Sequence, residues 1–243
     1  MLNFSIFSDK GGREINEDTV KVSEKGERKC FVLCDGLGGH GMGDVASQLV
    51  ARIIIEEFEK STDNEGLLET LFSKAQDALM TEQVSLHSER KMKTTAVVLL
   101  TDQDFARIGY IGDSRLYIFS KNRVKTRTID HSVAQMMALS RRIKESEIRN
   151  HPDRNIVLRV MGIEWEKPMY ELLAPVKLKK CQAFLLCSDG FWECVLEENM
   201  ERLLKETDDA GEWVRRMVDI ARSEELKKCD EMDNFSVIGI INK

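Results

Sequence analysis

Residues 31–36 read FVLCDG and residues 184–190 read FLLCSDG, so one pattern occurs twice at distant places in the chain. Each copy is an apolar run that ends in an aspartate followed by a glycine. Uninterrupted apolar runs of this length are typical of strands buried on both faces, and a glycine lets the backbone turn sharply after the strand. We therefore expect Asp35 and Asp189 to lie at the rim of a core built from sheets.

Further strands and three helices are predicted on either side of these two runs. Apolar residues recur with the spacing of amphipathic helices over residues 46–58, 68–79 and 213–221. The residues SKNR, at 120–123, predict a hairpin turn between two strands. The strand-like runs, many of them bounded by Gly, Asp, Asn or Ser, cover residues 3–8, 29–35, 94–100, 105–113, 115–120, 183–189 and 234–241.

The order of these elements favours an α+β fold. Strands come in groups and the first two helices come as a pair, whereas a doubly wound parallel sheet would alternate strands with helices. Two facing sheets would bury the apolar strand runs, and the helices would cover their outer faces. Because the chain has 243 residues, an ordinary apolar content and only three prolines, we interpret residues 1–243 as a single domain.

The composition argues against several classes of protein. The net charge is −6 and charges of both signs are intermixed, which is untypical of a nucleic-acid surface. No segment approaches the roughly 20 apolar residues that a membrane helix needs, and the chain does not begin with a secretory signal pattern. The six cysteines lack CxxC spacing, so we expect reduced structural thiols. We therefore expect a cytoplasmic protein that binds neither nucleic acid nor membrane.

Three more aspartates are expected near strand ends. Asp113 follows the run GYIG, Asp233 precedes the last predicted strand, and Asp18 lies in REINEDTV. Taken singly, each aspartate is better explained as a turn or cap residue. If the five converge, however, their charges repel strongly unless cations neutralise them. Oxygen ligands select Mg²⁺ or Mn²⁺ over zinc, for which four histidines are few.

Six motifs occur along the chain, and five of them contain one of these aspartates: REINED (13–18), FVLCDGLGGHGMG (31–43), GYIGDSRLY (109–117), TIDHS (128–132), LLCSDGFWE (185–193) and MDNFSVI (232–238). In sequence and order they resemble the metal-dependent protein phosphatases of type 2C, the PPM family, and especially its bacterial Ser/Thr phosphatases. The resemblance spans nearly the whole chain, so it does not depend on any single short motif.

The resemblance implies a four-layer α/β/β/α sandwich, in which helices flank two central antiparallel sheets. It also implies a ligand set for two or three Mn²⁺ or Mg²⁺ ions. Asp35 would bridge two cations, with the carbonyl of Gly36 on the first and with Asp189 and Asp233 on the second. Asp113, together with Asp189, would hold a third and weaker cation.

Other residues receive supporting roles from the same resemblance. Arg13 matches the phosphate-binding arginine of the family, and a guanidinium can hold two phosphate oxygens at once. Glu17 and Asp18 would orient metal-bound water, and Asn234 would support Asp233. Arg13 and Asp35 are therefore the expected catalytic residues.

The implied reaction is hydrolysis of phosphoserine and phosphothreonine on proteins by a water or hydroxide that bridges two cations. The expected partners are phosphorylated proteins, namely a Ser/Thr kinase and its substrates, and the protein is expected to act as a monomer in bacterial signalling.

The sequence departs from many eukaryotic members at Leu37, where they carry a histidine thought to be the general acid. The acid is therefore open, and His40 is better explained as a structural loop residue than as a replacement. Residues 141–161 fall where the family has a mobile flap beside the active site, and they are left without individual roles.

Two other functions remain to be distinguished. One is a non-catalytic PPM-fold module that senses or binds a ligand, since a fold alone does not establish an activity. The other is an aspartyl-phosphate transferase, in which Asp35 would be a nucleophile and a covalent phosphoenzyme would form.

Overall fold

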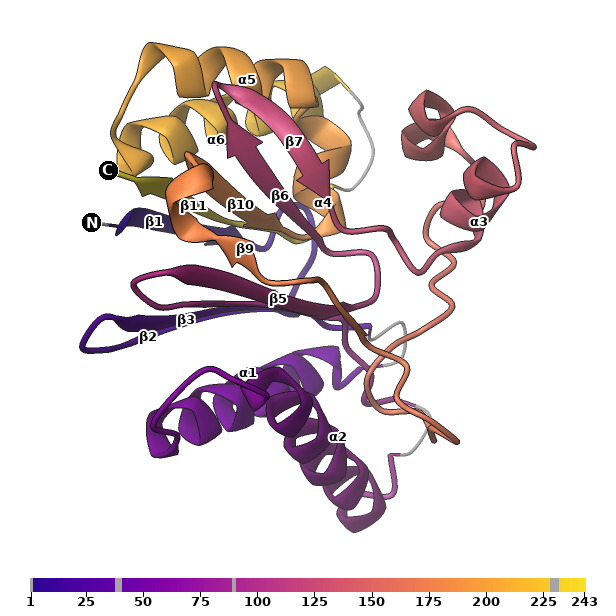
Figure 1. Ribbon diagram of the computed structural model, residues 1–243. Coiled ribbons are helices and arrows are strands. Elements are labelled where there is room, and N and C mark those ends of the chain that lie inside the picture. The colour runs from indigo at the N-terminus through magenta and orange to yellow at the C-terminus, as the bar shows by residue number, and fades with distance from the viewer. Residues whose placement is uncertain (1, 38–40, 89–90, 228–231) are drawn as a thin grey trace.

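The structure is a computed structural model that describes residues 2–37, 41–88, 91–227 and 232–243. Within these residues two antiparallel sheets face each other, and helices cover their outer sides (Figure 1). The first and last strands of the chain, β1 (Leu2–Asp9) and β11 (Phe235–Asn242), are neighbours in one sheet. The α+β sandwich expected from the sequence is therefore confirmed.

One sheet has five strands in the order β1-β11-β10-β6-β7. Its strands are β1 (Leu2–Asp9), β6 (Arg115–Ser120), β7 (Arg123–Arg127), β10 (Ala183–Cys187) and β11 (Phe235–Asn242). The other sheet has six strands, with β2-β3-β4-β5-β8 in order and β9 also paired to β5. Its strands are β2 (Asp18–Lys25), β3 (Arg28–Asp35), β4 (Ala96–Thr101), β5 (Phe105–Ile111), β8 (Glu171–Leu172) and β9 (Val176–Lys177).

Helices α1 (Gly43–Lys60) and α2 (Leu67–Ser85) cover the six-stranded sheet. The five-stranded sheet is covered by α4 (Asp189–Cys194), α5 (Glu197–Glu206) and α6 (Ala210–Lys227). Helix α3 (Val133–Leu139) and the 3₁₀ helix η1 (Glu145–Asn150) project to one side of the sandwich, and a second 3₁₀ helix, η2, spans Leu178–Lys180 (Figure 1). In the described ranges, no helix combines the length and apolar character needed to cross a bilayer.

Strand β3 shows why these sheets need partners on both faces. Phe31 and Leu33 pack between the sheets in the same cluster as Ile238 and Ile240 of β11. The alternate residues, such as Val32, pack instead against α1 and α2. Because side chains alternate along a strand, an apolar run without alternation buries both of its faces.

The three helices predicted from periodicity correspond to α1, α2 and α6, and each predicted strand run contains a strand. The sequence predicts a strand over the whole of residues 183–189, and this prediction is wrong for Ser188 and Asp189. The strand ends at Cys187, Ser188 takes the N-cap position, and Asp189 begins a helix that includes Gly190. The extent of the domain, residues 1–243, stays a prediction.

The predicted hairpin turn is confirmed between β6 and β7. Lys121 and Asn122 have φ angles of 52° and 59°, in the left-handed region. This pair of positive φ angles matches the right-handed twist of the flanking strands.

Replacing Lys121 by glycine should therefore stabilise the protein by about 1 kcal/mol, because glycine enters the left-handed region without steric cost. Lys121→Val should destabilise it by a similar amount. Urea unfolding of both variants measures the difference.

Lys125, an exposed residue of β7, provides the matched control. There the order should reverse, with Lys125→Val at least as stable as Lys125→Gly, because strands favour β-branched residues. The same order at both positions would contradict the account of the turn.

Candidate metal centre

The five aspartates singled out from the sequence lie at the same end of the two sheets. Asp35 is the last residue of β3, and Asp18, the first residue of β2, lies directly opposite it in the strand register. Asp113 follows the end of β5, Asp189 follows β10, and Asp233 precedes β11. Because neighbouring strands are antiparallel, these strand ends and beginnings meet at one edge.

The charges of these aspartates act on one another. The pKa of Asp35 is raised well above its ordinary value, first by burial and then by the charges of Asp189, Asp18, Asp113 and Asp233. The pKa of Asp189 is likewise raised, by burial and then by Asp113 and Asp233. The charges of the other four aspartates therefore make Asp35 harder to ionise, as expected if the five carboxylates converge.

Asp18 and Asp113 are the most deeply buried of the five, with 7% and 2% of their surface exposed. Burial raises the pKa of each to about 7. One carboxylate oxygen of Asp18, Oδ2, accepts a hydrogen bond of 2.8 Å from Ser188 Oγ. Its other oxygen, Oδ1, is buried and has no hydrogen-bond partner among the described residues.

Backbone hydrogen bonds fix the turn after β3. Thr95 N donates to the carbonyl of Asp35 at 2.8 Å, and Gly36 N donates to the carbonyl of Glu17 at 3.1 Å. A Cβ atom at Gly36 would lie only 2.3 Å from the carbonyl oxygen of Gly43. Only glycine therefore allows the start of α1 to approach this closely.

Asn234 attaches the N-terminal loop to the start of β11. Its Oδ1 accepts from Glu17 N at 2.8 Å, and its Nδ2 donates to the carbonyls of Lys10 at 2.8 Å and Ile15 at 3.0 Å. The loop between these residues carries Arg13. Asn234 thus acts on the loop as well as on Asp233, whose Oδ1 accepts from Asn234 N at 2.8 Å.

The loop brings Arg13 to the acidic group. Its Nη2 lies 3.0 Å from Asp233 Oδ2, and the two side chains are 47% and 42% exposed. Glu17 is half-buried, and its pKa is raised, chiefly by burial and then by Asp44. Arg13 therefore lies at the end of the two sheets that carries the carboxylates of Asp18, Asp35, Asp113, Asp189 and Asp233. We call this partly open end of the two sheets the acidic rim.

The chemistry of this donor set fits hard divalent cations. The donors are carboxylate oxygens, and added positive charge would favour their ionised forms. One of them is buried and has no hydrogen-bond partner in residues 2–37, 41–88, 91–227 and 232–243. In the part of the chain that the structure describes, no three Asp, Glu, His or Cys side chains are already arranged to hold a metal ion.

Two further features were singled out in the sequence, namely residues 38–40 and the segment 141–161. Gly38, Gly39 and His40 fall outside the described residues, so the expectation for His40 is not tested, while Leu37 N donates to the carbonyl of Lys93 at 2.9 Å. The segment 141–161 includes η1 and contacts the region of α4 and α5 through two arginines. Arg149 binds Glu197 at 2.6 Å, and Arg154 binds Glu193 at 2.8 Å.

Two residues beside the aspartates were not anticipated from the sequence. Ser188 donates to Asp18, and Trp192 Nε1 donates to the carbonyl of Asp113 at 3.0 Å. Both lie in the motif LLCSDGFWE, where a serine and a tryptophan next to an apolar run were the available signal.

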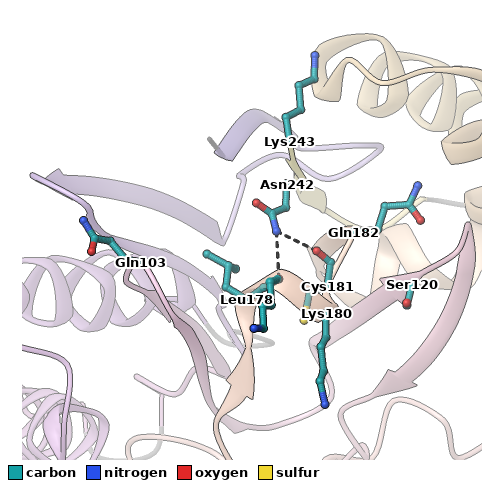
Figure 2. A pocket seen from close by; sticks show the side chains of 9 residues that line it. Gln103, Ser120, Leu178, Lys180, Cys181, Gln182, Asn242 and Lys243 are labelled. Carbon is teal, nitrogen blue, oxygen red and sulfur yellow. Dashed lines mark hydrogen bonds between the residues drawn. The ribbon is translucent and has the colours of Figure 1, made fainter.

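A pocket of about 530 Å³ lies at the opposite end of the strands (Figure 2). Gln182, directly before β10, and Asn242, at the end of β11, are in its lining, whereas Asp189 and Asp233 flank the other ends of these strands. Its lining also includes Lys179, Lys180 and Lys243, so it is not suited to cations.

Comparisons with known proteins agree with the fold. A family model described as Protein phosphatase 2C matches residues 11–232. The serine/threonine phosphatase stp of Listeria welshimeri is 31% identical over 202 residues, which are 79% of this chain and 79% of that protein.

Solved structures are similar over the whole described fold. Serine/threonine phosphatase Stp1 from Staphylococcus aureus has a TM-score of 0.88 and 27% identity, covering 100% of this chain and 96% of that one. The catalytic domain of the serine/threonine protein phosphatase PstP, solved in complex with 2 manganese ions, has a TM-score of 0.82 and 26% identity, covering 99% and 97%.

Together the fold, the sequence match and these similarities define a protein phosphatase. The chain belongs to the metal-dependent protein phosphatase family of type 2C, PPM. The family resemblance seen in the six motifs is thereby confirmed.

The raised pKa of Asp18 predicts how stability depends on pH in protein freed of metal by chelation. Because the folded state binds this proton more tightly than the unfolded state, the contribution is fully present below about pH 4 and is lost as pH rises towards 7. Asp18→Asn should therefore be more stable than the wild type at pH 8, by up to about 4 kcal/mol, and this difference should shrink below pH 5.

Urea unfolding at several pH values, with chelator present, measures both effects. An Asp18→Asn variant that is no more stable than the wild type at pH 8 would show that this carboxylate is not held at an unfavourable ionisation.

Proposed function

We propose that this phosphatase hydrolyses phosphoserine and phosphothreonine on proteins, using two or three Mn²⁺ or Mg²⁺ ions bound at the acidic rim. The observation that carries the proposal is the placement of Asp35, Asp189, Asp113 and Asp233 at the same end of the two sheets, where burial and then the charges of its neighbours raise the pKa of Asp35. The names of the similar phosphatases, and the two manganese ions in one of them, support it.

Asp35 would bind two cations, the carbonyl of Gly36 would bind the first, and Asp189 and Asp233 would bind the second. Asp113 and Asp189 would hold the third. When bound, such ions supply an acidified bridging water as the nucleophile and offset part of the charge on the phosphoryl group. The carboxylates ionise more readily in their presence, so binding should release protons.

The remaining residues would orient water and phosphate. Within the part of the chain that the structure describes, the buried Oδ1 of Asp18 lacks a hydrogen-bond partner, and it can accept a hydrogen bond from water. Glu17, held through its backbone by Asn234, is available for the same task at the rim. Arg13 can bind two phosphate oxygens with its planar guanidinium, which a lysine would contact only as a point charge.

The residue at position 37 cannot act as the general acid. Leu37 has no proton to give. The leaving serine or threonine oxygen would therefore take its proton from water. In this proposal the substrates are phosphorylated proteins, including a Ser/Thr kinase and its targets, and the enzyme acts as a monomer in the cytoplasm.

Removing one central carboxylate tests the proposal. Asp35→Asn and Asp189→Asn should each lower kcat on a phosphoserine peptide by at least about 100-fold with Mn²⁺ or Mg²⁺, because each removes a charged cation ligand. Asp77→Asn, on the exposed face of α2, is the matched control and should keep full activity. Phosphate release measured with each cation, and with chelator, gives the comparison.

Activity that survives chelation would overturn the metal-dependent mechanism. A covalent phosphoenzyme trapped by acid quench would instead support the rival in which Asp35 is a nucleophile. A wild-type protein that binds Mn²⁺ but hydrolyses no phosphopeptide would favour the non-catalytic module.

A further inference from the structure

Trp192 connects two segments that carry candidate cation ligands. It lies in α4, three residues after Asp189, and only 2% of its surface is exposed. Its indole Nε1 donates a hydrogen bond of 3.0 Å to the backbone carbonyl of Asp113, which follows β5 in the other sheet. This hydrogen bond joins the Asp113 loop to the helix that begins at Asp189, and it adds to the pairing of Arg115 with Cys187 in the adjoining strands.

The indole ring is itself held by a buried arginine. The guanidinium of Arg115 lies 3.5 Å from the centre of the Trp192 ring, a distance at which cation and π system attract each other. Arg115 is 3% exposed and makes two hydrogen bonds to Asp130, of 2.9 Å and 2.6 Å. Because a two-point ion pair fixes the plane of the guanidinium, it also fixes the ring stacked on it.

The segment that projects from the sandwich reaches the same helix. Arg149 lies 5.5 Å from the centre of the Trp192 ring and is bound to Glu197 at 2.6 Å. Arg154 binds Glu193, the residue after Trp192, at 2.8 Å. Trp192 is thus enclosed by charged groups that are themselves paired.

We propose that Trp192 is a positioning residue for the cation between Asp113 and Asp189, and that its indole N–H holds the two ligand-bearing segments at the separation which that cation requires. The inference rests on the proposed function, because the cation is part of it. Trp192 itself touches neither cation nor substrate.

The physical reason is that two carboxylates drawn to one ion repel each other until the ion is bound. A buried hydrogen bond between their segments opposes this separation, and a neutral hydrogen bond is typically worth about 1 kcal/mol. Its loss should weaken the third cation roughly three- to tenfold. The second cation, which would share Asp189 with the third, should weaken less, because Asp35 and Asp233 would also bind it.

Trp192→Phe removes the N–H donor and keeps an aromatic ring for Arg115 to stack on. Trp213→Phe is the matched control. Trp213 is also fully buried, and its Nε1 also donates 3.0 Å to a backbone carbonyl, that of Met200, but it lies in α6 away from the acidic rim. Both variants should lose a similar amount of stability in urea unfolding.

Titration of the full chain with Mn²⁺ alone, followed by isothermal calorimetry, is the test. Trp192→Phe should weaken the weakest binding step roughly three- to tenfold, and Trp213→Phe should leave all steps unchanged. In an Asp113→Asn background, where that step is already impaired, Trp192→Phe should cause no further change.

Equal Mn²⁺ isotherms for Trp192→Phe and the wild type would overturn the inference and leave the proposed function standing. Equal weakening by both tryptophan variants would also overturn it, because the effect would then be a general loss of stability. A wild-type protein that binds two ions and no third would remove the cation that Trp192 is proposed to position. A wild-type protein that binds no Mn²⁺ would overturn the proposed function as well.

Discussion

Repulsion between carboxylates at one end of a buried core is the constraint on which the rest of this structure depends. Strand pairing places Asp18 opposite Asp35, and the adjoining strand ends add Asp113, Asp189 and Asp233. In a medium of low dielectric these charges cannot all remain ionised without compensation. The fold nevertheless holds them together, so the stability of the two sheets must offset the repulsion between the carboxylates.

Close backbone contacts make that arrangement possible. Gly36 lets the start of α1 approach the end of β3, and a Cβ at Gly190 would lie 2.3 Å from the carbonyl oxygen of Asn234. Asn234 in turn fastens the loop that carries Arg13. The rim is therefore built from strand ends and glycines, while the side chains that face it come from segments remote in sequence. This is why single substitutions at small residues here should disturb the site as much as changes at the acids.

The fold was predictable where a segment carries its own signal. The run from Phe31 to Cys34 is buried on both faces, and its unbroken apolar sequence predicts this. Strand β2 is half-exposed and carries only two alternating valines, so the sequence did not predict it. Helices α3 and α4 have 7 and 6 residues, too few for clear periodicity. Helix α5 has 10 residues with Met200, Leu203 and Leu204 at helical spacing, and this short signal was overlooked.

The positions of the aspartates followed from the strand pattern, but Ser188 and Trp192 act through contacts across the two sheets, which local sequence does not encode. The roles assigned to individual ligands rest on family resemblance and stay predictions.

X-ray diffraction from crystals grown with Mn²⁺, at a wavelength where manganese scatters anomalously, tests the central claim most directly. The account predicts anomalous peaks bound by the carboxylates of Asp35, Asp189 and Asp233. A map in which manganese is absent from these carboxylates would contradict it.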